Sequence, residues 1–318
     1  MAETMKLLIG YDGSPCGDAA LRDLRRAGLP AAAEALILSV ADVFLPVAPS
    51  VSAQSAEAVE RESAKQAHGA AQQALAEARE RAETARQTVQ SAFSGWSVRA
   101  EARADSPAWA IILRADRWKP DLIVVGSHGH STLGRLVFGS VSHTVVTQAR
   151  GSVRVARGQE KPDDAPIRLI IGCDGSTDAD LAVRAVAKRA WPSGTEARVL
   201  AVRDSALCTA VAARLTPRPA ADEAREAEAE EEDEAAIVQN MVEAAAEPLR
   251  MAGLSVEAVV REGDPKQVLI AEAEAWGADC LFVGARGLRG LERLLLGSVS
   301  AAVAMRAHCS VEVVRAAE

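Results

Sequence analysis

The chain carries one sequence pattern twice, and this repeat limits its fold more than any other feature. "KLLIGYDGS" at 6–14 returns as "RLIIGCDGS" at 168–176, and "PDLIVVGSHG" at 120–129 returns as "ADCLFVGARG" at 278–287. Three further pairs of segments match in the same order: 35–42 with 197–204, 104–111 with 262–269, and 151–157 with 309–315. The repeat therefore indicates two copies of one domain in tandem.

The boundary between the copies is marked by "GQEKPDDAP" at 158–166, which is polar and contains two prolines. Such a composition is typical of a linker. A chain of 318 residues also has the length expected of about two ordinary domains. We therefore predict a first domain at 1–157, a linker at 158–166 and a second domain at 167–318.

Within each copy, short apolar runs alternate with segments of helical pattern. The runs "ALILSV" at 35–40 and "LIVVG" at 122–126 are apolar throughout, as expected for strands that are buried on both faces of a sheet. Strands that alternate with helices favour a parallel sheet with right-handed crossovers. The prediction is an α/β fold with two doubly wound open sheets. The alanine-rich stretch 53–93 predicts a long surface helix, with a coiled-coil arm as the alternative.

Composition narrows the class of protein. The formal net charge of −8 and the pI of about 5.4 argue against a nucleic-acid partner, although a local basic pocket stays open. The five cysteines include no Cys-x-x-Cys pair, so neither a disulfide framework nor a zinc site is expected. No apolar run reaches the length of a membrane span, and the start of the chain lacks a leader pattern. We therefore expect a cytoplasmic protein without a membrane partner.

A glycine-rich loop follows the fourth predicted strand of each copy with the spacing Gly-x2-Gly-x9-Gly-Ser. Because Gly126 and Gly129 lack a Cβ, the backbone there can adopt positive φ and a ligand can approach its N–H groups closely. Ser140 is expected to cap the next helix, whose N-terminus favours an anion. We predict a phosphate cradle in each copy, with plain turn glycines as the alternative. The loops lack the Gly-Lys-Ser/Thr of a P-loop and do not follow the first strand as a dinucleotide fingerprint would.

Together with the aspartate that ends each first strand, this spacing resembles the ATP-binding branch of the universal stress protein family. The resemblance covers almost the whole chain as two tandem domains. It implies an open five-stranded parallel sheet of order 3-2-1-4-5 in each domain, with the ligand at the carboxyl ends of strands 1 and 4. The implied ligand is ATP or ADP, with Mg²⁺ or Mn²⁺ bridging the phosphates.

The resemblance also implies a role for each matching residue. Asp12 and Asp174 would lie near adenine and ribose, unless they only cap the helix that follows. The backbone of Val40 and of Val202 would pair with the adenine edge. The implied nucleotide contacts are Asp12, Val40, Gly126, Ser127, His128, Gly129, Gly139 and Ser140 in the first copy, and Asp174, Val202, Gly284, Arg286, Gly287, Gly297 and Ser298 in the second.

The two loops differ in charge. The second copy has Ala285 and Arg286 where the first has Ser127 and His128. The second loop contains three arginines, Arg286, Arg289 and Arg293, whereas the first contains only Arg135. The three arginines either strengthen phosphate binding in the second loop or lie outward on a solvated surface. His128 is expected to be a hydrogen-bonding residue rather than a general base.

No catalytic arrangement of Ser, His and Asp, and no paired-carboxylate motif, can be recognised from order and spacing. We therefore favour a nucleotide-binding regulatory protein that acts on an unknown protein partner. A slow ATPase or phosphotransferase and a nucleotide-free scaffold are the alternatives. Family members usually dimerise through the last strand, so "SVRVAR" at 152–157 and "SVEVVR" at 310–315 are expected to pair within the chain. The sequence is also compatible with further assembly of two chains into a homodimer.

Overall fold

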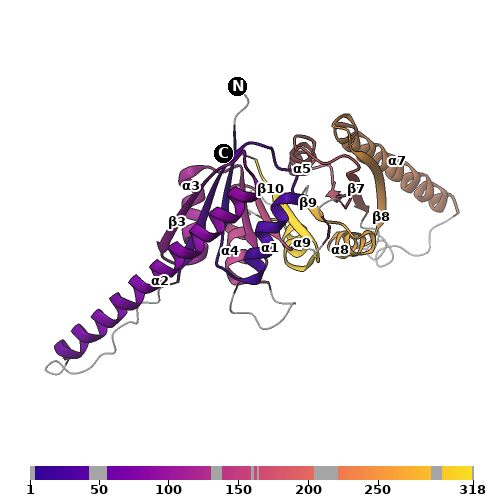
Figure 1. The fold of residues 1–318 in the computed structure, drawn as a ribbon. Helices are drawn as coiled ribbons and strands as arrows, with labels where there is room; N and C mark the ends of the chain where they lie inside the picture. The colour runs from indigo at the N-terminus through magenta and orange to yellow at the C-terminus, as the bar shows by residue number, and fades with distance from the viewer. Residues whose placement is uncertain are drawn as a thin grey trace.

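The computed structural model describes residues 4–42, 56–129, 138–158, 161–162, 165–203, 221–287 and 296–316, and the side chains of 56–66 and 221–234 are not described (Figure 1). Ten strands form one sheet of order β3-β2-β1-β4-β5-β10-β9-β6-β7-β8. All pairs within a half are parallel, whereas the β5–β10 pair that joins the halves is antiparallel. The predicted α/β fold with two helix-flanked half-sheets is confirmed.

The elements alternate strand and helix along both halves. In the first half they are β1 (Met5–Gly10), α1 (Pro15–Asp23), η1 (Leu24–Arg26), β2 (Ala33–Ala41), α2 (Ala56–Ala92), β3 (Ser97–Ala104), α3 (Pro107–Trp118), β4 (Leu122–Gly126), α4 (Ser140–Gln148) and β5 (Val153–Ala156). In the second half they are β6 (Arg168–Gly172), α5 (Thr177–Ala187), β7 (Glu196–Arg203), α7 (Ala221–Met251), β8 (Ser255–Glu262), α8 (Pro265–Trp276), β9 (Cys280–Gly284), α9 (Ser298–Arg306) and β10 (Ser310–Val314).

The two faces of the sheet carry different cores. On one face, a single apolar cluster runs through both halves beneath α3, α4, α8 and α9, and includes Ile111, Val145, Leu269 and Val303. On the other face, α1 and α2 cover one cluster and α5 and α7 cover another. The shared cluster makes the interface between the halves part of the hydrophobic core, which disfavours their independent motion.

The long predicted helix is α2, which extends beyond the sheet at the lower left of Figure 1. Its buried positions Ala78, Ala82, Ala85 and Val89 repeat at intervals of three or four residues, and the last three belong to the core cluster of the first half. This spacing is that of one buried helix face. Among the described residues, no helix is both long and apolar enough to cross a bilayer.

The seam between the halves is built from β5 and β10. Val155 lies opposite Val311 and Val153 opposite Val313, with Arg154 and Glu312 between them. The intramolecular pairing of the last strands that the sequence predicted is therefore present. Part of the predicted linker packs on the first half, because Arg26 donates to the carbonyl oxygens of Pro162, Ala165 and Pro166 at 3.1 Å each.

Candidate functional site

The carboxyl ends of neighbouring parallel strands meet at one edge of each half-sheet. In the first half, β1 pairs with both β2 and β4, so Asp12, Val40 and the loop after Gly126 come together there. In the second half, β6 pairs with β7 and β9 in the same way and gathers Asp174, Val202 and the loop after Gly284. Every predicted site residue lies at one of these two edges.

An aspartate turn links each first strand to its helix. Asp12 Oδ1 accepts from the backbone N–H of Ser14 at 2.9 Å, and Ser14 Oγ accepts from the N–H of Gly17 at 3.0 Å. Ser14 is thus the N-cap of α1, and the alternative that Asp12 caps this helix is wrong. Asp174 and Ser176 form the same arrangement before α5.

The turn also needs a glycine that the sequence analysis missed. Gly13 has φ +79° and Gly175 has φ +78°, a region that side chains rarely adopt. The repeated "DGS" at 12–14 and 174–176 was the available signal. The left-handed glycine lets the aspartate fold back onto the chain and orients its carboxylate toward the loop.

The first glycine of each loop serves packing. A Cβ on Gly126 would lie 2.9 Å from the carbonyl oxygen of Cys16, and one on Gly284 would lie 2.5 Å from the carbonyl carbon of Asp178. These glycines therefore let the start of α1 or α5 lie directly against the end of β4 or β9. Neither Gly126 nor Gly129 uses the positive φ that a glycine permits, since neither residue is in the left-handed region.

The second glycine of each loop lies against the aspartate turn. A Cβ on Gly129 would come within 3.0 Å of Asp12 Oδ2, and one on Gly287 within 2.5 Å of Asp174 Oδ2. The missing side chain thus brings the loop backbone beside a carboxylate. A side chain at Gly129 or Gly287 would therefore displace the carboxylate of Asp12 or Asp174.

The helices after the loops begin at glycine. Gly139 is the N-cap of α4 with φ −68° and ψ 144°, so the expectation that Ser140 is the cap is wrong by one residue. Gly297 is likewise the N-cap of α9. Neither cap offers a side-chain oxygen, and no side-chain cap bond forms at either helix among the described residues. The N–H groups of each first turn therefore face the loop without a capping side chain.

A buried serine anchors each of these helix starts. Ser142 Oγ donates to the carbonyl oxygen of Gly126 at 2.6 Å, and Ser300 Oγ donates to that of Gly284 at 2.6 Å. Gly139 N also donates to Ser127 O at 2.9 Å. The sequence analysis missed the serines, although "GSVS" recurs at 139–142 and 297–300. The bonds set the helix start at a defined distance from the strand end.

The two sites differ around the second loop position. In the first, the half-buried His128 has Nδ1 2.8 Å from Ser127 Oγ and 3.8 Å from Cys16 Sγ. Desolvation, together with the positive charge of Arg157, lowers the pKa of His128. The imidazole is therefore neutral near neutral pH, as a hydrogen-bonding residue would be.

In the second site, Arg286 takes the place of His128 and binds the start of α5. Its backbone N–H and its Nε both donate to Asp178 Oδ2, at 3.0 and 3.1 Å. The charge of Arg286 is thus balanced by a carboxylate of the protein. Arg135, Arg289 and Arg293 lie outside the described residues.

Each edge places glycines and a helix N-terminus, which no described side chain caps, near a carboxylate, Asp12 or Asp174. Backbone N–H groups and glycine-lined space occupy one side, and Asp12 or Asp174 occupies the other. The described part of the chain contains no cluster of three or more His, Cys, Asp or Glu that could hold a metal ion.

Comparison with known proteins agrees with this architecture. The family model described as the universal stress protein family matches residues 3–157 and again 168–315. A universal stress protein of Mycolicibacterium smegmatis is 29% identical over 222 residues, which cover 70% of each chain. Universal stress protein YxiE of Bacillus subtilis is 30% identical over 151 residues, which cover 46% of this chain and 98% of YxiE.

A solved structure shares the fold across both halves. The crystal structure of a universal stress protein from Archaeoglobus fulgidus matches with a TM-score of 0.57 and 18% identity, over 98% of this chain and 97% of that one. Because the family model matches both halves, this chain belongs to the universal stress protein family as a tandem member.

Proposed function

We propose that the chain binds an adenine nucleotide, ATP or ADP, at the carboxyl edge of each half-sheet and acts as a regulatory protein. The observation that carries this proposal is the pair of helix starts at Gly139 and Gly297, neither of which is capped by a described side chain. First-turn N–H groups and the helix dipole together form a site for phosphate. Each such start faces a glycine loop that lies against an aspartate.

The remaining edge residues suit the rest of a nucleotide. Asp12 and Asp174 are the carboxylates beside the loops and would bind ribose hydroxyls. Val40 and Val202 lie near the carboxyl ends of β2 and β7, where their backbone groups would meet the adenine edge. Ser140 and Ser298, at the first helical positions, would add hydroxyl contacts to the phosphates or to a Mg²⁺ or Mn²⁺ ion. One site in 1–157 and one in 167–318 follow from the repeat.

We prefer a regulatory role to catalysis because the described groups at the edges are suited to binding a nucleotide and not to activating a water molecule. A hydrolase must orient a water molecule for attack on the terminal phosphate. His128 is the one imidazole in the described part of the first loop, and it lies within hydrogen-bond distance of Ser127. A partner protein would then recognise the conformation that the loops adopt when nucleotide is bound.

The decisive experiment identifies the ligand that the protein retains. We expect ATP or ADP in the supernatant when purified protein is denatured and its small molecules are separated by chromatography. Calorimetry on stripped protein should then show two sites for ATP and much weaker binding of GTP. No retained nucleotide together with no heat of ATP binding at millimolar concentration would contradict the proposal. Many turnovers of ATP per minute with Mg²⁺ would favour the enzyme instead.

A further inference from the structure

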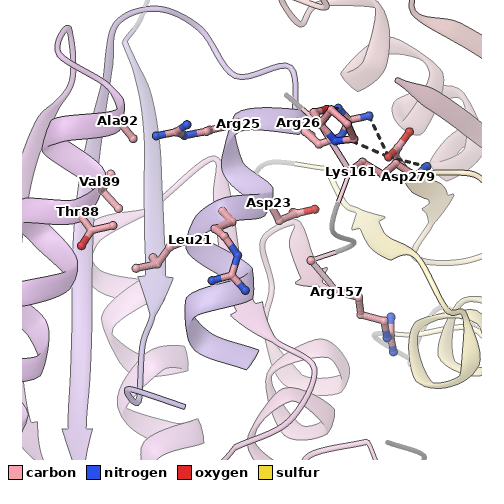
Figure 2. Close-up of a pocket in the computed structure, with 13 residues that line it drawn as sticks. Leu21, Asp23, Arg25, Arg26, Thr88, Val89, Ala92, Arg157, Lys161 and Asp279 are labelled. Atoms are coloured by element: carbon pink, nitrogen blue, oxygen red, sulfur yellow. Dashed lines mark hydrogen bonds and ion pairs between the residues drawn. The ribbon is translucent and has the colours of Figure 1, made fainter. Parts of the chain in front are cut away.

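A cavity lies at the junction of the two halves, and none of its lining residues is among the predicted nucleotide contacts. It has a volume of about 760 Å³, within the usual range for small-molecule pockets (Figure 2). Its walls come from α1, η1, α2, the chain after β5 and the residue before β9. The lining residues are Leu21, Arg22, Asp23, Arg25, Arg26, Thr88, Val89, Ala92, Arg157, Gly158, Lys161, Pro162 and Asp279.

The lining is cationic in a chain whose overall charge is −8. It contains five arginine or lysine residues against two aspartates. Both aspartates are already engaged. Asp23 accepts from Arg154 Nε at 2.6 Å and from Ser310 Oγ at 2.7 Å, and Asp279 pairs with Arg26 at 3.1 Å and with Lys161 at 2.9 Å. Arg26 and Lys161 therefore share one carboxylate, and Asp23 is bound to Arg154 and not to a lining cation.

Two of the cations have no carboxylate partner among the described residues. Arg22 is an exposed residue of α1. Arg157 is largely buried, and its guanidinium donates to the carbonyl oxygens of Ala304 at 2.5 Å and Cys309 at 3.3 Å. Burial lowers the pKa of Arg157 to about 10, so the group is still charged near neutral pH. Because the Arg157 guanidinium is turned toward α9, its charge acts on an anion in the cavity from a distance, and Arg22 is the group that would contact such an anion (Figure 2).

The cavity also has an apolar wall. Figure 2 shows Leu21 on α1 facing α2, where Val89 and Ala92 lie, while Lys161 and Arg26 meet Asp279 on the opposite side. Leu21 and Val89 belong to the core cluster of the first half and are 6% and 2% exposed, so the apolar surface open to a ligand comes mainly from Ala92, Pro162 and the alkyl stems of the arginines and Lys161. A ligand that fits both walls has a charged end and an apolar body.

We propose that this seam cavity binds a small organic phosphate. Guanidinium groups match phosphate oxygens in fork geometry, which favours phosphate over a simple halide. The apolar wall favours an organic phosphate over the bare ion. Such a ligand would touch helices of the first half, the linker and Asp279 of the second half, so it would hold the seam closed. The inference does not depend on nucleotide binding at the two edges.

The second half offers a matched control. Arg184 stands 162 residues after Arg22, the offset between the repeats in this region, and is exposed on α5 as Arg22 is on α1. The position equivalent to Arg25 is Ala187. Arg184 does not line the seam cavity. Exchange of Arg184 for Gln therefore removes the same charge from the protein without touching the cavity.

The test uses phenyl phosphate and inorganic phosphate on the full chain with Gly129→Val and Gly287→Val, which fill the loops at both edges. Calorimetry at low salt should show phenyl phosphate bound about tenfold more tightly than inorganic phosphate. Arg22→Gln should weaken phenyl phosphate about tenfold, as expected for one lost charge-assisted contact, and Arg184→Gln should leave its Kd unchanged.

Three results would overturn the assignment. One is no heat of binding for either probe. Another is an equal loss of affinity in Arg22→Gln and Arg184→Gln, which would indicate general charge attraction. The third is binding that occurs in the wild-type chain and disappears when the two loop glycines are replaced, which would place the probe at the nucleotide edges.

Discussion

Arg154 and Glu312 lie directly opposite each other at the centre of the antiparallel β5–β10 seam. Their side chains are 1% exposed, and Arg154 Nη1 is 3.4 Å from Glu312 Oε2. The two residues occupy equivalent positions in the repeat, so an identical pair of halves would place two like charges there. Asp23 binds Arg154 and Arg189 binds Glu312, which extends the pair into a buried chain of alternating charges.

Removal of the Glu312 carboxylate should destabilise the protein strongly. Glu312→Gln leaves Arg189 without its carboxylate and puts Arg154 opposite a neutral group. Breaking a buried ion pair typically costs about 3 kcal/mol or more, because the remaining charge stays desolvated. Urea unfolding followed by circular dichroism and tryptophan fluorescence measures the loss.

Glu257→Gln is the control for that measurement. It breaks the Arg198–Glu257 pair, in which the glutamate side chain is 60% exposed. Exposed pairs contribute less than about 1 kcal/mol. Equal losses in the two variants would show that the seam pair contributes no more than a surface pair.

The first two glycines of a loop should respond differently to substitution. Gly126→Ala places a methyl group against the Cys16 backbone and should lower the free energy of unfolding by about 2 kcal/mol. Gly129→Val meets the end of the Asp12 side chain, which can move, so its stability cost should stay below about 1 kcal/mol while ATP affinity at the first site falls about tenfold. Thermal unfolding and calorimetry on both variants test this separation. Unchanged ATP affinity in a folded Gly129→Val protein would refute the cradle at that loop.

The sequence predicted the fold well because its signals are local and repeated. Apolar runs that alternate with helical segments have few solutions other than a parallel sheet. The family resemblance predicted the pairing of the last strands, for which the duplication supplies both partners in one chain. The role of each glycine was not predictable from the sequence. Spacing alone does not tell whether the missing Cβ permits a positive φ, a close packing contact or the approach of a ligand. The seam charges were hidden as well, because Asp23 and Glu312 lie 131 and 158 residues from Arg154.

The pKa of His128 should report on the first site. Burial and Arg157 favour the neutral imidazole, so its folded-state pKa lies below the ordinary value of about 6.5. The neutral form stabilises the fold above that value, and this contribution is lost as the pH falls through the folded-state pKa. Nuclear magnetic resonance titration of the ring proton should show the low pKa, and ATP should raise it because phosphate favours the imidazolium. A pKa at or above 6.5 in nucleotide-free protein would contradict this environment.

Release of Arg286 should strengthen the second site. Asp178→Asn removes the carboxylate that now binds this arginine at the start of α5. The freed guanidinium should increase ATP affinity several-fold and make it fall more steeply with salt. Calorimetry in a Gly129→Val background isolates the second site. Asp180→Asn removes an exposed carboxylate from the same helix turn, and an equal gain in that control would show a general charge effect.

Each half also caps a helix of the other half. Arg157, which follows β5, donates to Ala304 O in the last turn of α9 and to Cys309 O just beyond this helix. Arg315, which follows β10, donates to Val146 O at 2.6 Å and to Gly151 O at 3.2 Å, at the end of α4. Carbonyl groups at a helix C-terminus lack intrahelical partners, so a buried arginine there stabilises the last turn. These are the helices that begin at Gly139 and Gly297 in the candidate nucleotide sites.

Substitution of these arginines should therefore loosen the helix of the opposite half. Arg315→Gln should speed amide hydrogen exchange in the last turn of α4 and leave α9 unchanged, while Arg157→Gln should do the reverse. A loss of about 1–2 kcal/mol corresponds to exchange roughly five- to thirtyfold faster where local opening governs it. Arg306→Gln removes an exposed arginine from the last turn of α9 itself and should change exchange little. Faster exchange in the substituted half alone would show that the crossed contacts do not hold these helices. The opposite-half pattern would mean that the stability of each site's helix depends on the other domain.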